Sequence, residues 1–237
     1  MTGNIYLDDL YNSVSKIDQV FITFDTYIGL EKGENISDNP FFQAEIEKNN
    51  ADEYILRFLE SQKNIREHSL ERNFCYQLYY RWYSIVNGTG HKYSSLNLNG
   101  EINKANLTLP LKNYENLKNL SLFEKIKENG LIDQTYFVPD FVLHGGQDNI
   151  NHQTLIAEVK LNENLKSGNF EKDFYKLAIY QKLYQFKSCC FIILKMNIKE
   201  LLTELKKVDT DTVDKKSFWF ILKNVNNTLI LCLDDLV

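Results

Sequence analysis

The sequence predicts an α/β protein in which helices cover a mixed central sheet and all 237 residues belong to a single domain. Two observations predict this fold class. The spacing of apolar residues changes from a helical period to the alternation typical of strands, and the predicted elements then follow the order helix, strand, strand, strand, helix, strand. Hydrophobic residues make up 43% of the chain, which supplies a large core and excludes intrinsic disorder.

Composition also limits where the protein acts and what it binds. The net charge of −5 argues against a protein that coats nucleic acid without specificity, but it allows an enzyme with a local basic cleft. The four cysteines lie in apolar stretches without CxxC spacing, so we expect buried, reduced thiols. No apolar run approaches the ~18 residues of a membrane-spanning helix, and the N-terminus lacks a signal sequence. We therefore expect a cytoplasmic protein without a membrane segment.

Two amphipathic helices are predicted in the first half of the chain. The first covers 41–61 and begins after Pro40, a residue that helices tolerate in their first turn. The second covers 69–86, with Ser69 as its N-cap, and the run Asn87-Gly88-Thr89-Gly90 ends it. Its apolar residues at helical spacing are Leu70, Phe74, Leu78, Trp82 and Ile85.

Strands dominate the centre of the chain, where apolar and polar residues alternate between turn signals. These signals are Asn99-Gly100, Asn129-Gly130 and Gly145-Gly146. The predicted elements are strands at 93–98, 136–143 and 154–161 and a short helix at 117–128.

The last third of the chain supplies a long helix, a very apolar strand and a closing hairpin. The helix is predicted at 170–186, the strand at 189–195, and the hairpin from strands at 218–223 and 228–233. We divide the single domain into an N-terminal helical extension (1–68), a core (69–196) and a C-terminal helix with hairpin (197–237).

Charged residues interrupt two of the central strands. Glu158 and Lys160 stand two residues apart in an otherwise apolar strand, so both side chains leave the same face. Burying these charges is unfavourable unless they pair or bind a ligand. Asp140 follows Pro139 at the start of the preceding strand, and it lies beside them if the two strands form a hairpin. Two carboxylates supply the hard oxygen ligands that Mg²⁺ prefers, with a lysine beside them.

Plainer interpretations of these residues stay open. Glu158 and Lys160 could form a mutual salt bridge at a sheet edge, or lie on a solvated edge strand. Asp140 could be a turn residue that follows proline.

Pro139-Asp140 followed by Glu158-x-Lys160 resembles the signature of the PD-(D/E)xK nuclease-like superfamily. The resemblance extends over roughly residues 69 to 196. It implies a restriction-endonuclease-like αβββαβ core, to which this chain adds N-terminal helices and a C-terminal β-hairpin. The members that the chain most resembles are small bacterial proteins of unassigned role.

Glu71 and Gln181 extend the candidate site. Glu71 projects into the apolar sector of its helix, so its carboxylate needs a partner at the core edge. In the superfamily, a glutamate from the first core helix often completes the metal site, and a glutamine or tyrosine often reaches the site from the helix that corresponds to 170–186. Two alternatives remain. Glu71 could be a first-turn residue that the helix dipole stabilises, and Gln181 could bind backbone groups.

Other polar residues are expected at the surface. Glu101 is interpreted as an exposed turn residue and His144 as a surface residue at a strand end. Lys172, Lys176 and Lys187 share one face of the long helix, which predicts a solvated stripe of charge.

The resemblance implies a metal-dependent nuclease that hydrolyses phosphodiester bonds, with DNA as the expected substrate. Asp140 and Glu158 would hold Mg²⁺ or Mn²⁺ together with the Val159 carbonyl, and Glu71 would be a further ligand. Lys160 would orient the attacking water or stabilise the developing charge. The active form could be a homodimer or include a partner protein.

Two other function classes compete with the nuclease. The chain could be a catalytically inactive binding or regulatory module with the same fold, or a partner subunit in a host-defence or mobile-element system. The absence of GxGxxG and GxxxxGK[ST] patterns argues against dinucleotide-dependent enzymes and kinases.

Overall fold

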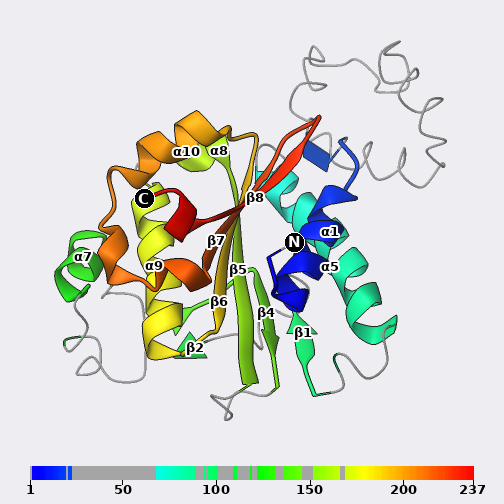
Figure 1. Ribbon diagram of the computed structural model, residues 1–237, viewed down its shortest axis with the longest axis horizontal. Coiled ribbons are helices and arrows are strands. Elements are labelled where there is room, and N and C mark those ends of the chain that lie inside the picture. Colours follow the sequence, from blue (N-terminus) through cyan, green and yellow to red (C-terminus); the bar gives the residue numbers. More distant parts are fainter. Residues whose placement is uncertain are drawn as a thin grey trace.

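A six-stranded mixed sheet, flanked by helices, forms the centre of the protein (Figure 1). The computed structural model describes residues 2–19, 21–22, 68–88, 93, 95–100, 109–110, 118, 122–131, 136–145, 152–165 and 169–237. In spatial order the strands are β1 (Asn97–Asn99), β4 (Phe141–His144), β5 (Gln153–Leu161), β6 (Ser188–Leu194), β7 (Phe218–Lys223) and β8 (Thr228–Cys232). The prediction of a mixed α/β protein is confirmed.

The sheet combines antiparallel and parallel pairs. β1, β4 and β5 pair antiparallel, β5, β6 and β7 pair parallel, and β8 returns antiparallel to β7. The buried strand β6 lies between two parallel neighbours and is apolar almost throughout, as expected for a strand covered on both faces. The predicted C-terminal hairpin is confirmed, and it extends the same sheet.

Helices cover both faces of this sheet. α1 (Ile5–Ser15) and α5 (His68–Gly88) lie on one side, and α9 (Asn169–Leu183) and α10 (Ile198–Leu205) lie on the other (Figure 1). Side chains of β5 alternate between the two layers, because Ile156 packs in the cluster of α9 whereas Ala157 and Val159 pack in the cluster of α5. This alternation decides which layer each polar residue of β5 faces.

The predicted strand at 136–143 is wrong, because two separate strands occupy this segment. β3 (Tyr136–Phe137) pairs with β2 (Leu109–Pro110) in a small second sheet, and β4 begins only at Phe141. Pro139 lies between them, and proline has no N–H group to donate to a ladder. The break leaves Asp140 at the entrance to β4.

Several element boundaries also differ from the prediction. The helix predicted at 69–86 begins at His68, so Ser69 lies inside it and is not its N-cap. β1 is shorter than the strand predicted at 93–98, and α7 (Phe123–Glu128) forms the end of the helix predicted at 117–128. The long helix ends at Leu183, because Gln185 adopts a positive φ of 56°. The helix predicted at 41–61 lies outside the described residues.

The four cysteines are free thiols buried in the core, so their expected burial is confirmed. Within the part of the chain that the structure describes, no helix is long and apolar enough to cross a membrane.

Candidate active site

Asp140 lies beside β5, at the point where β4 begins. Phe141 pairs with Ala157, and one further step in this antiparallel register brings Asp140 opposite Glu158. The carboxylate is buried, and its Oδ2 atom accepts a hydrogen bond of 2.8 Å from the Val159 N–H group. Asp140 is therefore fixed to the central strand and is not a solvated turn residue.

Glu158 is buried more deeply than Asp140, with only 1% of its surface exposed. It leaves β5 on the same face as Ile156, toward α9. Its Oε1 atom lies 2.6 Å from Nζ of Lys176, which also donates a hydrogen bond of 3.2 Å to the Val138 carbonyl. Lys176 is thus packed against Glu158 inside the protein, and its predicted place in a solvated stripe is wrong.

Lys160 and Glu71 meet where β5 ends. Nζ of Lys160 donates a hydrogen bond of 3.1 Å to Oε1 of Glu71, which comes from the first turn of α5. Oε2 of Glu71 accepts longer bonds of 3.3 Å from the Leu161 N–H group and 3.4 Å from the Asn164 side chain. The expectation that Glu71 finds a partner at the core edge is confirmed, and that partner is Lys160.

Asp173 is the fourth acid of the site and is buried, and the sequence did not single it out. It precedes Lys176 by three residues on α9, so the two side chains lie on one face of that helix. Burial raises the pKa of Asp173, and the charges of Lys160 and Lys176 oppose the shift. One signal could have identified these residues: apolar side chains surround Asp173 and Lys176 along the helix, which leaves little solvated face for a charge.

The pKa shifts show how strongly the charges of this cluster interact. Burial raises the pKa of Glu158 to about 8, with Asp140 adding to the shift and Lys176 and Lys160 opposing it. Burial alone would lower the pKa of Lys160, but the nearby charges of Asp140, Glu158, Asp173 and Glu71 outweigh it and raise that pKa. Lys160 therefore keeps its positive charge at neutral pH.

The cluster carries more acids than bases. Two lysines, Lys160 and Lys176, face four carboxylates, so full ionisation leaves two negative charges. These carboxylates are Glu71, Asp140, Glu158 and Asp173. One divalent cation would neutralise this excess, which is otherwise costly in a buried place.

The donor set fits Mg²⁺ better than a metal that needs a full cage of side chains. Among the described residues, no three acidic, histidine or cysteine side chains lie close enough together to form a metal-binding group. Mg²⁺ usually binds through one or two carboxylates and keeps several waters, so Asp140 and Glu158 suffice. Because the Val159 N–H group points toward Asp140, the Val159 carbonyl points toward the same side of the strand. The cation would have to replace Lys176 at Glu158.

The stability of the metal-free protein is predicted to fall as pH rises from about 5 to about 8. Folded Glu158 keeps its proton up to a pKa of about 8, whereas an unfolded glutamate releases it near 4.5, so the folded state binds the extra proton in this window. The contribution is full below 4.5 and is lost as pH passes about 8. The loss is on the order of 4 kcal/mol. Urea unfolding at several pH values measures it, and an equal slope in Glu158→Gln would contradict the assignment.

Gln181 contacts a different part of the protein. Its Nε2 atom donates hydrogen bonds of 3.1 Å to the Asp214 carbonyl and 2.9 Å to Oγ of Ser217, and its Oε1 atom accepts one of 2.7 Å from the Asp214 N–H group. These bonds fix the segment that leads into β7. The placement favours the alternative in which Gln181 binds backbone groups, because its amide bonds go to Asp214 and Ser217.

Gln181→Ala is predicted to destabilise the protein without slowing catalysis. Removing the amide takes away the side-chain partners of the Asp214 backbone groups, which costs about 1–2 kcal/mol. Thermal unfolding compared with Lys182→Ala, an exposed neighbour on the same helix, measures the effect. If Gln181→Ala is as stable as Lys182→Ala but cleaves more slowly per folded molecule, Gln181 has a role in the active site.

The remaining polar predictions have separate outcomes. His144 is buried, and its Nε2 atom lies 2.7 Å from Nδ2 of Asn99 across the β1–β4 pair, so its predicted surface position is wrong. The pairing of the two strands explains this burial. Glu101 lies outside the described residues.

The sequence and structure were compared with protein families, with curated proteins and with solved structures, and nothing matched in any of the three. The resemblance to PD-(D/E)xK nucleases therefore stays a prediction from the sequence motif.

Proposed function

We propose that the protein is a metal-dependent nuclease that hydrolyses phosphodiester bonds in DNA, with Mg²⁺ or Mn²⁺ bound by Asp140 and Glu158. The observation that supports this most strongly is the concentration of buried charge around the end of β5. Lys160 pairs with Glu71, Lys176 pairs with Glu158, and the charges of Asp140 and Asp173 also act on Lys160. They come from the β4 entrance, β5, α5 and α9. Buried charge of this density is costly for folding and is typical of functional sites.

Each group of the cluster has a distinct part in this proposal. Asp140 and Glu158 contribute carboxylate oxygens to the cation, and Val159 contributes its carbonyl. Bound there, the cation would neutralise charge on the scissile phosphate and lower the pKa of an attacking water. Glu71 holds Lys160 at 3.1 Å, so it positions that lysine, and it becomes a metal ligand only if it exchanges this bond.

Lys160 acts in this proposal as a fixed positive charge. Its raised pKa keeps the ammonium protonated at neutral pH, so it cannot serve as a general base. An ammonium that Glu71 holds and that stays 21% exposed can instead donate a hydrogen bond to a phosphate oxygen as negative charge develops there.

A cleavage assay with defined substrates tests the proposal. Labelled single-stranded and duplex DNA, and RNA of the same sequence, are incubated with the protein in Mg²⁺, Mn²⁺ or EDTA. We expect cleavage of DNA with either cation and none in EDTA. Asp140→Asn purified in parallel controls for a contaminating nuclease. Equal cleavage by both preparations, or no cleavage of any substrate, would contradict the proposal.

A binding or regulatory module without catalysis is the second candidate. It is favoured by the contact of 2.6 Å between Lys176 and Glu158, because this lysine occupies one of the two carboxylates that would bind the metal. Calorimetric titration with Mn²⁺ separates the two functions. Heat of binding that depends on Asp140 supports the nuclease, and its absence supports the module.

A further inference from the structure

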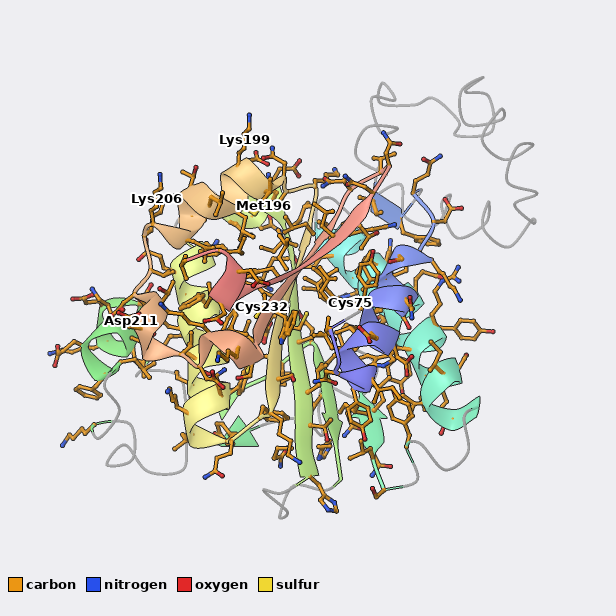
Figure 2. All side chains as sticks on the ribbon, viewed as in Figure 1. Cys75, Met196, Lys199, Lys206, Asp211 and Cys232 are labelled. Carbon is orange, nitrogen blue, oxygen red and sulfur yellow. The ribbon has the colours of Figure 1, made fainter. Side chains whose placement is uncertain are left out.

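Tyrosines line the outer face of α5, the helix that carries Glu71. Tyr76, Tyr80 and Tyr83 are 39%, 72% and 46% exposed, and Tyr79 is half-buried beside them. The opposite side of the helix faces the sheet and is buried, including Cys75, which is labelled in Figure 2. Exposed large aromatic side chains are therefore concentrated on one surface of this helix.

These side chains form a continuous stripe together with Arg72. At the helical period, Arg72 and the four tyrosines fall within an arc of about 100° and extend over about 16 Å along the axis. Arg72 directly follows Glu71, so the stripe begins in the same helical turn that carries the partner of Lys160. We call this set the tyrosine stripe: Arg72, Tyr76, Tyr79, Tyr80 and Tyr83.

Part of the tyrosine stripe is already held in place. The rings of Tyr79 and Tyr83 stack with centroids 5.4 Å apart and an interplanar angle of 22°. Tyr79 also packs so closely on Gly100 that a Cβ atom there would lie 2.6 Å from its Cδ2 atom. A fixed ring loses little conformational freedom when a flat partner stacks on it.

The chemistry of the stripe favours nucleobases over other occupants. Flat rings with polar edges bind bases through stacking, and a neighbouring arginine contacts the phosphate backbone. The stripe exposes no aliphatic side chain of the kind that a lipid surface or an apolar helix would need. Between residues 71 and 88 the only acid is Glu71, and its carboxylate is turned toward Lys160. The helix thus offers a local positive charge on a chain whose net charge is −5.

We infer that the tyrosine stripe binds the unpaired bases of single-stranded nucleic acid and leads the strand to Lys160. The inference rests on the proposed function for the identity of the strand and for its direction toward the cluster. It adds a substrate class, since duplex DNA keeps its bases stacked inside and cannot lay them on exposed rings.

Fluorescence anisotropy in EDTA tests this inference without cleavage. A labelled single-stranded DNA is compared with its duplex, for wild type and for Tyr80→Ala/Tyr83→Ala. We expect the single strand to bind more tightly than the duplex, and the double variant to lose about 10-fold or more in affinity. Tyr80→Phe/Tyr83→Phe should keep most of the affinity, because phenylalanine also stacks.

Controls separate stacking from general attraction and from misfolding. Lys199 and Lys206 extend into solvent from α10 on the other side of the sheet (Figure 2), so Lys199→Ala/Lys206→Ala should bind the single strand like wild type. Circular dichroism and thermal unfolding verify that the tyrosine variants are folded. Unchanged affinity of the alanine variant, a preference for duplex, or no binding by wild type would overturn the inference. So would light scattering that shows these tyrosines to mediate self-association instead.

The result also distinguishes this inference from the proposed function. If Asp140→Asn binds the single strand normally and wild type does not cleave it, the inference about the tyrosine stripe is correct and the proposed nuclease function is wrong. If wild type cleaves DNA but the alanine variant binds and cleaves like wild type, only the stripe is wrong.

Discussion

Lys160→Met is expected to lower the rate of DNA cleavage by roughly 10²- to 10³-fold while leaving divalent-cation binding intact. Methionine keeps much of the length of the side chain but removes the ammonium that Glu71 holds at 3.1 Å. Losing one oriented donor to a developing negative charge usually costs a factor of this size. Single-turnover cleavage in saturating Mg²⁺ gives the rate, and Mn²⁺ calorimetry gives the affinity.

Asp140→Asn is the matched variant for this experiment. Asparagine keeps the shape of the side chain and an oxygen that can accept from the Val159 N–H group, but it removes the negative charge. We expect it to lose both cation binding and cleavage, whereas Lys160→Met loses cleavage only. A Lys160→Met protein that cleaves at the rate of wild type would show that Lys160 has only a structural role.

Lys176→Met is expected to destabilise the metal-free protein by about 3–5 kcal/mol above the pKa of Glu158. It leaves the carboxylate of Glu158, which is 1% exposed, buried without the ammonium 2.6 Å away. Breaking one partner of a buried ion pair has a cost of this size. At a pH below the Glu158 pKa of about 8 the loss of stability should be smaller, because Glu158 then holds a proton. Urea unfolding of both proteins at one pH above and one pH below the Glu158 pKa provides the measurement.

Two further variants test the ion pair itself. Lys172→Met removes a lysine from the same helix and should change the stability by no more than about 0.5 kcal/mol. Adding Glu158→Gln to Lys176→Met should restore part of the loss, because no buried charge is then left alone. If Lys176→Met is as stable as Lys172→Met, the contact with Glu158 contributes nothing and the ion pair is not a feature of the folded protein.

Local sequence patterns predicted the elements that have strong periodicity. The core of α5, the strand β5 and the hairpin of β7 and β8 each carry a strong apolar pattern, and the structure has them within a few residues of their predicted bounds. The prediction for the segment at 136–143 was wrong because its apolar pattern continues across Pro139, whereas the hydrogen-bond ladder of a strand cannot. Periodicity reports burial, and it does not show where hydrogen bonding stops.

The candidate site was predictable only in part, for a similar reason. Asp140, Glu158 and Lys160 stood out because a buried strand and its entrance rarely carry charge, and Glu71 because it interrupts an apolar helix sector. Lys176 escaped because a lysine on a helix is normally solvated, and only tertiary packing brings it to Glu158. Gln181 was predicted as a site residue because its amide faces inward, but an inward amide can equally well bind a backbone segment, as this one binds Asp214.

The most direct test of the central claim is an anomalous difference map from a crystal soaked in Mn²⁺. We predict one strong peak within coordination distance of the Asp140 and Glu158 carboxylates, with the Lys176 ammonium moved away from Glu158. The contradicting result is a fully soaked crystal without a peak between these carboxylates, in which Lys176 still contacts Glu158.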